Sequence, residues 1–217
     1  MTEVAATGPF VFIVDDDANI RASLSRALGL RGYEVRTYAS AAAFLEAYDT
    51  SLSGCLLLDY GMPDMDGLQL QQHLKEAGIA VPVIFITGHG GIPESVQAMK
   101  MGAIDFLEKP FKNSVLIERI ESAFQADASR RAVLRQNSGT VARFNALTER
   151  EREIALIMST DPGRNSSKEI ARQLGISPRT VDHHRARILE KMDVSSVAEL
   201  VETTLKAGLF KESPPPE

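Results

Sequence analysis

Short apolar runs alternate with amphipathic stretches over the first 125 residues of the chain. Runs of strand length occupy the ranges 10–14, 33–37, 54–58, 81–87 and 105–108. Between these runs, apolar residues recur every three or four positions, as at Ile20, Leu24 and Leu28, which is the periodicity of an amphipathic helix. Strands that alternate with helices in this way predict an α/β domain built on a doubly wound, five-stranded parallel sheet.

The run 33–37 is the most polar of the five. A polar strand fits best at the edge of a parallel sheet, because the central strands are covered on both faces. An edge position for the second strand favours the order 2-1-3-4-5, which is the flavodoxin-like arrangement. In such sheets ligands bind beyond the carboxyl ends of the strands where the order reverses, here between the first and third strands.

The apolar pattern weakens after the fifth predicted helix and then becomes entirely helical. We expect a partly helical linker over 126–145 and a small all-α domain over 146–211. The polar ends of the chain, at 1–8 and 212–217, are expected to be disordered tails.

A helix-turn-helix is expected within the second domain. A short helical pattern runs from Ser167 to Leu174 and is followed by Gly175 in a turn. Ser177 is a favourable N-cap, and Pro178 is favourable as the first residue of the next, longer and more basic helix. A short helix, a glycine-containing turn and a longer basic helix together are typical of a helix-turn-helix.

Composition and charge narrow the class of protein. Hydrophobic residues make up 44% and charged residues 24% of the 217 residues, which is ordinary for two small globular domains. No apolar stretch has the length of a membrane span, and the single cysteine, Cys55, excludes an internal disulfide, so we expect a cytoplasmic protein. Residues 1–126 hold 9 Lys and Arg against 16 Asp and Glu, whereas residues 127–217 hold 15 against 13. The acidic first half is therefore poorly suited to bind nucleic acid, whereas the second half could do so if its bases share a face.

Chemically useful side chains follow four of the predicted strands. Asp59 comes directly after the apolar run 55–58, Asp15 and Asp16 follow the first strand, Thr87 ends the fourth and Lys109 follows the fifth. Because the carboxyl ends of parallel strands meet at one edge, these groups are expected to form one site. Acids, a hydroxyl and a lysine around one carboxylate are what reversible phosphorylation of an aspartate requires.

Roles in that site follow from the donor types. Mg²⁺, or Mn²⁺, prefers a few oxygen ligands together with water. We expect Asp16, Asp59 and the backbone carbonyl of Gly61 as direct ligands, and Asp15 as a ligand through water. Thr87 and Lys109 are expected to pair with the phosphoryl oxygens.

These positions resemble the receiver domain of two-component response regulators over residues 9–125. The matching segments are Val14-Asp15-Asp16-Asp17, Asp59 with Met62-Pro63 and Gly67, Thr87-Gly88, and Lys109-Pro110-Phe111. The resemblance implies that a sensor histidine kinase supplies the phosphoryl group and that Asp59 accepts it. It also implies that Thr87 and Phe106 act as switch residues.

The second half resembles the LuxR-type helix-turn-helix, and the whole chain resembles the NarL/FixJ class of regulators. The matching segments are Leu147-Thr148-Glu149-Arg150-Glu151, Lys168-Glu169-Ile170-Ala171, Ile176-Ser177-Pro178-Arg179-Thr180-Val181, His184 and Lys191-Met192. The resemblance implies that Asp182, His183 and Ala186 face the bases. The candidates for contacts with DNA phosphates are Lys168, Arg179, Thr180, Arg185, Arg187 and Lys191.

Two features depart from that family pattern. Asp182 replaces the basic residue of other versions of the motif; it repels phosphate, but its carboxylate could accept a hydrogen bond from a cytosine amine. The polar segment 159–166 is longer than the usual connection by about three residues, and its role stays open.

The predicted function is a phosphorylation-controlled transcription factor rather than an enzyme, with at most self-phosphorylation from small phosphodonors and slow loss of the phosphoryl group. Double-stranded DNA, a second copy of the chain after phosphorylation, and RNA polymerase are the expected partners, with no membrane partner. One alternative is a phosphatase of the haloacid dehalogenase type, which would use Asp15-Asp16-Asp17 but leaves Asp59 and the helix-turn-helix unexplained. Another alternative is a receiver whose output domain binds protein, because Asp182 disfavours DNA.

Overall fold

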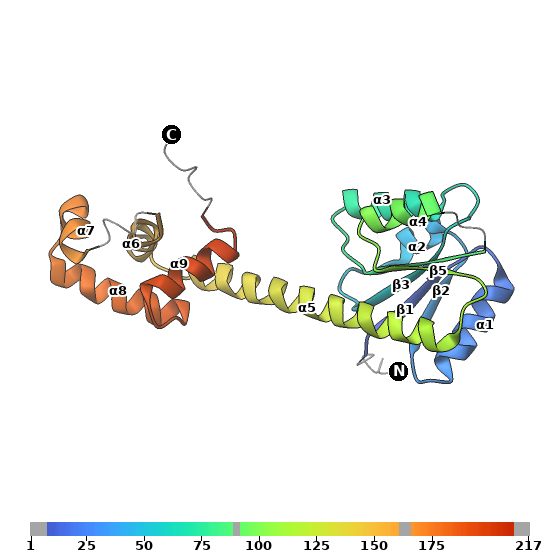
Figure 1. The fold of residues 1–217 in the computed structure, drawn as a ribbon. Coiled ribbons are helices and arrows are strands. Elements are labelled where there is room, and N and C mark those ends of the chain that lie inside the picture. Colours follow the sequence, from blue (N-terminus) through green and yellow to red (C-terminus); the bar gives the residue numbers. More distant parts are fainter. Residues whose placement is uncertain (1–7, 89–91, 161–165, 211–217) are drawn as a thin grey trace. The chain divides into compact units, whose positions relative to one another are not determined.

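The computed structural model describes residues 8–88, 92–160 and 166–210 (Figure 1). The chain divides into two compact units, Met1–Arg130 and Arg131–Glu217. Residues 1–7 of the predicted N-terminal tail and residues 161–165 of the enlarged segment 159–166 lie outside the described residues. The whole predicted C-terminal tail, 212–217, also lies outside them.

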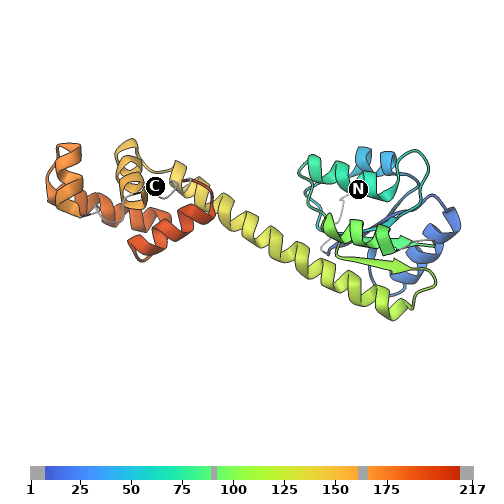
Figure 2. The same cartoon turned by 45° about the horizontal axis from the view of Figure 1, so that its top comes forward.

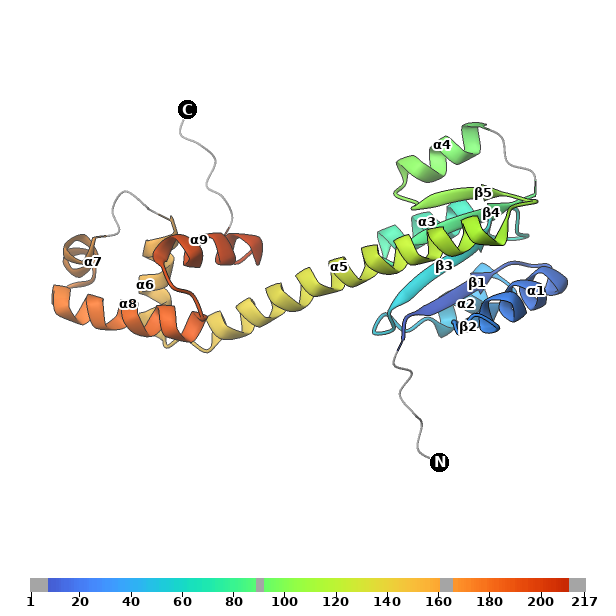
Figure 3. The ribbon, with the colours of Figure 1, turned by 60° about the horizontal axis from the view of Figure 1, so that its bottom comes forward.

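The first unit is built on a parallel sheet, as the sequence predicts. Its strands are β1 (Phe10–Val14), β2 (Glu34–Tyr38), β3 (Gly54–Asp59), β4 (Val83–Thr87) and β5 (Asp105–Glu108). All neighbouring pairs are parallel and the order is β2-β1-β3-β4-β5, which confirms the predicted order (Figure 3). The partly exposed β2 is an edge strand, and the order reverses between β1 and β3.

Helices cover both faces of this sheet (Figure 1). They are α1 (Ala18–Gly29), α2 (Ala41–Ala47), α3 (Gly67–Glu76), α4 (Ile92–Lys100) and α5 (Asn113–Asn145). Helices α2, α3 and α4 pack on one face, around Phe12, Leu56 and Phe85. Helices α1 and α5 pack on the other face, around Ile13, Leu57 and Ile84. Strand side chains alternate between two cores, so the central strands β1, β3 and β4 are apolar over most of their length.

Two strands begin later than the apolar runs indicate. The amide of Tyr33 donates to the carbonyl of Leu28 at 3.2 Å, so Tyr33 closes the turn after α1 instead of entering the ladder. Gly32, at φ 86°, allows that turn because the left-handed region favours glycine. In β4, Val81 and Pro82 precede the strand, and proline has no amide hydrogen to donate to a neighbouring strand.

Helix α5 is longer than the weakening sequence pattern indicates, since it runs unbroken through the predicted linker (Figure 2). Residues 132–136 are exposed on every side of the helix, so no apolar stripe marks their helical periodicity. Asp127 is 2% exposed and accepts hydrogen bonds from the Gly54 amide, at 3.0 Å, and from Arg130. The first part of this linker therefore belongs to the first unit. Within the described residues, every helix is too short or too polar to cross a membrane.

The second unit is helical. Together with the end of α5 it contains α6 (Glu149–Thr160), α7 (Ser167–Leu174), α8 (Pro178–Met192) and α9 (Val197–Lys206). Its core includes Phe144, Leu147, Ile154, Met158, Ile170, Val181, Ile188, Met192 and Leu200. The predicted helix boundaries are found at the turn, where Gly175 ends α7 in the left-handed conformation and the Ser177 hydroxyl accepts from the Thr180 amide.

We predict that Gly54→Ala destabilises the first unit by about 3 kcal/mol or more. Gly54 has φ 153°, and an added Cβ would lie 2.0 Å from the carbonyl oxygen of Phe10. Tyrosine fluorescence during urea unfolding measures this, because the 4 tyrosines all lie between residues 33 and 60 and the chain has no tryptophan. Gly29→Ala is the control: its Cβ would meet no atom within 4 Å, so stability should change by less than about 1 kcal/mol. Equal effects of the two substitutions would contradict the prediction.

Candidate functional site

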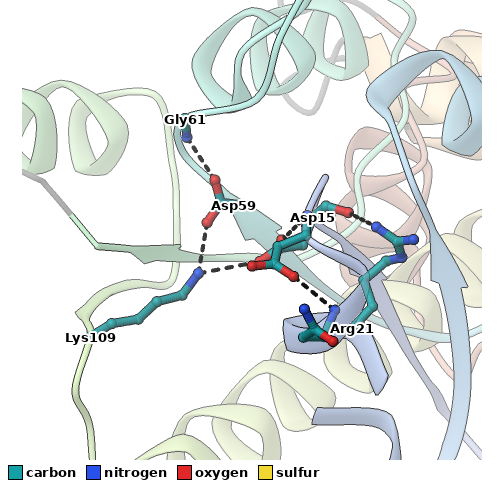
Figure 4. A network of polar contacts seen from close by, with 7 residues as sticks. Asp15, Arg21, Asp59, Gly61 and Lys109 are labelled. Carbon is teal, nitrogen blue, oxygen red and sulfur yellow. Dashed lines mark hydrogen bonds and ion pairs between the residues drawn. The ribbon is translucent and has the colours of Figure 1, made fainter. Parts of the chain in front are cut away.

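Three charged side chains meet beyond the carboxyl ends of the strands (Figure 4). The Lys109 ammonium donates to Asp59 Oδ1 at 2.9 Å and to Asp15 Oδ2 at 3.2 Å. Asp59 ends β3, Asp15 follows β1 and Lys109 follows β5, so three separate strands bring them together. Their side chains are 12%, 4% and 22% exposed respectively, which shields the charges from bulk water.

Burial and charge act in opposite directions on the two ends of this network. Burial raises the pKa of the Asp15 carboxyl above its ordinary value, and the opposing attraction of Lys109 is too weak to reverse this. Burial would lower the pKa of Lys109, but its hydrogen bonds and attraction to Asp59 and Asp15 outweigh burial and raise that pKa. Lys109 therefore stays a cation between the two acids at neutral pH.

Backbone groups fix the orientation of both acids (Figure 4). The Gly61 amide donates to Asp59 Oδ2 at 2.8 Å, and the Asp17 amide donates to Asp15 Oδ1 at 2.8 Å. Gly67 makes the turn after β3 possible, because a Cβ there would lie 2.5 Å from the Asp59 carbonyl oxygen. Asp59 therefore keeps one oxygen on a backbone amide and the other on Lys109.

Arg21 is a site residue that the sequence analysis did not single out. Its guanidinium donates to the carbonyl oxygen of Asp15 at 2.6 Å, from the first turn of α1 (Figure 4). The sequence does place Arg21 four residues after Asp17, which is the N-cap of α1 and accepts from the Asn19 amide at 2.7 Å. This spacing puts Arg21 in the first turn of the helix. Residues in the first turn of a helix that follows a strand end lie close to that end, so Arg21 could have been proposed.

The remaining predicted residues of this site lie around the three charged groups. Thr87 ends β4, next to the strand that carries Asp59, and is buried. Asp16 is exposed at the start of the loop after β1. Phe106 is half-buried, with its ring 6.2 Å from the Tyr60 ring. The structure thus pairs Lys109 with Asp59 and Asp15 and places Thr87 and Asp16 at the same edge of the sheet, whereas Phe106 pairs with Phe85 within the sheet, before that edge.

The carboxylate oxygens of this site suit a hard metal cation, but in the structure they pair with the Lys109 ammonium. Carboxylates and a backbone carbonyl are the ligands that Mg²⁺ prefers. In the described part of the chain, however, no group of three or more His, Cys, Asp or Glu side chains is arranged to hold a metal ion. Lys109 bridges two of the three predicted carboxylates, so a metal bound here would share them with that ammonium.

In the second unit, α8 has one buried and one exposed face. Val181, Ile188 and Met192 are fully buried in the core. The predicted DNA-contacting residues Arg179, Thr180, Asp182, His183, Ala186 and Arg187 are exposed, as is Lys168 on α7, whereas Arg185 is half-buried. The exposed residues of α8 lie three or four positions apart, so one face of the helix is open to a partner.

Several of the predicted DNA-contacting residues, among them Asp182, Arg185 and Lys191, have partners within the protein. Asp182 Oδ1 accepts from the Ser167 hydroxyl, whose oxygen accepts from Arg185 at 3.2 Å. Lys191 donates to Glu151 at 2.6 Å, so its charge is already compensated by a carboxylate. The role of Lys191 at DNA phosphates stays a prediction.

Glu151 joins the start of α6 to the end of α8 through one carboxylate. It is 1% exposed, accepts from the Thr148 amide at 2.9 Å and pairs with Lys191 of α8. Burial by itself would raise the pKa of Glu151, but the hydrogen bonds from Lys191 and Thr148 outweigh it and lower the pKa to about 2. The start of α6 is thereby fixed to the end of α8.

Both units match described protein families. Residues 11–121 match the family described as response regulator receiver domain, and residues 145–204 match bacterial regulatory proteins, luxR family. The chain is 41% identical over 198 residues to the transcriptional regulatory protein FixJ of Rhizobium meliloti (strain 1021), covering 91% of this chain and 96% of that protein. The chain belongs to the FixJ/NarL family of response regulators.

Solved structures agree with this FixJ/NarL assignment. The response regulator StyR is 41% identical, with a TM-score of 0.78 over 91% of this chain and 98% of that one. Full-length FixJ from B. japonicum is 38% identical, with a TM-score of 0.56 over 94% of this chain and all of that one. The response regulator TodT of Pseudomonas putida (strain F1) is 38% identical over 89% of this chain and 84% of that protein.

Membership of this family settles the predicted class. The protein is a regulator that couples phosphorylation of a receiver to transcription through a LuxR-type DNA-binding domain. The receiver implies a histidine kinase as partner and the second domain implies DNA. The regulator family argues against the phosphatase alternative, and the luxR-type domain favours DNA over protein as the partner of the second unit.

We predict that Glu151→Gln destabilises the second unit of this FixJ/NarL regulator at pH 7 by about 1–3 kcal/mol. The pKa of Glu151 falls from 4.5 to about 2 on folding, so the carboxylate stabilises the fold above pH 4.5 and loses this effect as the pH falls towards 2. The difference between wild type and variant should therefore shrink over that range.

Circular dichroism during urea unfolding from pH 7 to pH 2.5, with tyrosine fluorescence to separate the first unit, measures this difference. Glu190→Gln, on the exposed side of α8, is the matched control and should leave stability unchanged within about 0.5 kcal/mol. A Glu151→Gln effect that is independent of pH would show that the charge is not the stabilising feature.

Proposed function

We propose that Asp59 accepts a phosphoryl group from a histidine nitrogen of the cognate kinase. The observation that carries this proposal is the placement of Asp59 at the open edge of the sheet, held by Gly61 and Lys109. A carboxylate oxygen attacks the phosphorus, the bond from phosphorus to the kinase nitrogen breaks, and an acyl phosphate forms on Asp59. Small phosphodonors would serve the same reaction, and slow hydrolysis of the acyl phosphate would return the resting state.

Charge sets the requirements of this step. Lys109 offsets one of the two carboxylates that it contacts, so an incoming phosphoryl group meets a site that is still acidic. Mg²⁺, which receiver domains of this family typically use, would be held by Asp16, Asp59 and the Gly61 carbonyl, with Asp15 through water. Bound there, the ion would neutralise negative charge on the carboxylate and on the phosphoryl oxygens, and so reduce the repulsion between them.

After transfer, Lys109 would move its hydrogen bond from the Asp59 carboxylate to a phosphoryl oxygen, and the Thr87 hydroxyl would donate to another. Thr87 is on β4, and β4 pairs with β5, the strand that carries Phe106. A shift of Thr87 would thus displace β5 and change the packing of the Phe106 ring against Tyr60 and Phe85. This repacking is the proposed signal to the outer surface of the receiver.

The output of that signal is the association of two chains and tighter binding to DNA. A two-fold dimer places two copies of α8 on successive half-sites of a roughly palindromic sequence. Arg179, Thr180, Arg185, Arg187, Lys168 and Lys191 would contact phosphates, while Asp182, His183 and Ala186 would face base edges. RNA polymerase is the further proposed partner, and the cytoplasm is where kinase domain, DNA and polymerase meet this protein.

The proposal predicts that phosphorylation raises DNA affinity by about tenfold, a typical coupling between two sites. The probe is a duplex enriched from a random-sequence library by wild type treated with acetyl phosphate and Mg²⁺, and fluorescence anisotropy gives its Kd. Asp59→Asn should bind with the untreated affinity, whatever the treatment. Asp64→Asn, an exposed acid in the turn after β3, is the matched control and should respond like wild type. An equal response of Asp59→Asn would contradict the proposal.

A further inference from the structure

The exposed carboxylate of Asp182 is unusual on a face that approaches DNA, because it adds negative charge opposite phosphates. Asp182 lies in the N-terminal part of α8, where a recognition helix contacts base edges. Its side chain is exposed, and the positive charges of Arg179 and Arg187 are exposed on the same helix. A carboxylate in that position opposes binding to phosphates unless it accepts a hydrogen bond from a base.

The orientation of this carboxylate is fixed by α7. Arg185 donates to the Ser167 oxygen at 3.2 Å, and a guanidinium can only donate. The single hydroxyl proton of Ser167 is therefore directed to Asp182 Oδ1. A chain of donors thus runs from Arg185 through Ser167 to Asp182, and it holds the Asp182 side chain in one orientation.

The base that suits such a group follows from the edges of the major groove. An ionised carboxylate is an acceptor, so it needs an amine. Guanine and thymine present only acceptors to it, and adenine presents its amine next to the N7 acceptor, which would repel a second carboxylate oxygen. Cytosine presents the N4 amine without a neighbouring acceptor, so it is the base that fits best.

We propose that Asp182, oriented by Ser167 and Arg185, selects a cytosine at one position of each half-site. This inference rests on the proposed DNA-binding function and names one base within its target. Asp182 is the specificity-determining residue, whereas Ser167 and Arg185 are positioning residues that act through it.

The test is selection of binding sites from a random-sequence duplex library by the full chain, treated with acetyl phosphate and Mg²⁺. Wild type should enrich a site with an invariant cytosine in each half. Asp182→Asn should change that position to adenine, because an amide pairs with adenine N6 and N7, and should leave the other positions unchanged. On the wild-type site, the variant should lose about tenfold or more in affinity relative to its own selected site.

Asp193→Asn is the matched control, since it also removes one acidic charge close to the end of α8. Asp193 is 84% exposed and adopts φ 56°, a conformation that asparagine tolerates. Asp193→Asn should still select cytosine at that position. Any rise in its DNA affinity measures the effect of removing one negative charge, separately from base selection.

Ser167 gives an independent readout. Ser167→Ala should keep the cytosine as the best base but reduce its preference over thymine by about threefold or more, and Ser167→Thr should restore the preference. A purely structural role of Ser167 would change total affinity without changing this ratio.

Failure of DNA binding and failure of the cytosine assignment give different results in this selection. If wild type enriches no sequence in any phosphorylation state, the proposed DNA-binding function fails and the inference fails with it. If wild type enriches a site but Asp182→Asn enriches the same site, the function stands and the assignment of cytosine to Asp182 is overturned.

Discussion

The first unit depends on one ammonium group held between two carboxylates. Lys109 meets Asp59 and Asp15 because three parallel strands end at the same edge and each is followed by a charged residue. Buried charges are costly unless they are paired, so this arrangement is stable only while the cation stays in place or is replaced by another. The same requirement makes the edge responsive to a phosphoryl group, which changes the charge that Lys109 must offset.

The second unit uses paired charges in two ways. Glu151 and Lys191 form a link between α6 and α8 in which the carboxylate is buried, and this link stabilises the helix-turn-helix. Ser167, Asp182 and Arg185 form an exposed link between α7 and α8. The first contributes mainly to stability, whereas the second orients a side chain towards a partner. Burial decides between the two roles, because charge pairs in water contribute little to stability.

Much of the fold could be predicted because hydrophobic periodicity and strand-end chemistry are local signals. The sheet order followed from the polar character of 33–37, and Asp59, Asp15 and Lys109 followed from their positions directly after apolar runs. Helix α5 was harder to delimit, because an exposed helix carries no apolar stripe over 132–136.

Contacts between distant residues could not be predicted in this way. Asp127 binds the amide of Gly54, a residue 73 positions earlier in the chain, and this backbone group has no signature in the sequence. The same holds for Ser167, whose proton is directed to Asp182 only because α7 and α8 pack together. Such contacts depend on how the elements pack together. They have no fixed spacing along the chain by which a single sequence could reveal them.

The central claim is that Asp59 is the phosphate acceptor of an acidic, metal-dependent site. Intact mass spectrometry after incubation with acetyl phosphate tests it most directly, on wild type and Asp59→Asn, each with Mg²⁺ and with a chelator. We expect one added phosphoryl group on wild type with Mg²⁺, and none on the variant or in the presence of the chelator. An adduct on Asp59→Asn, or no adduct on wild type with Mg²⁺, would contradict the account.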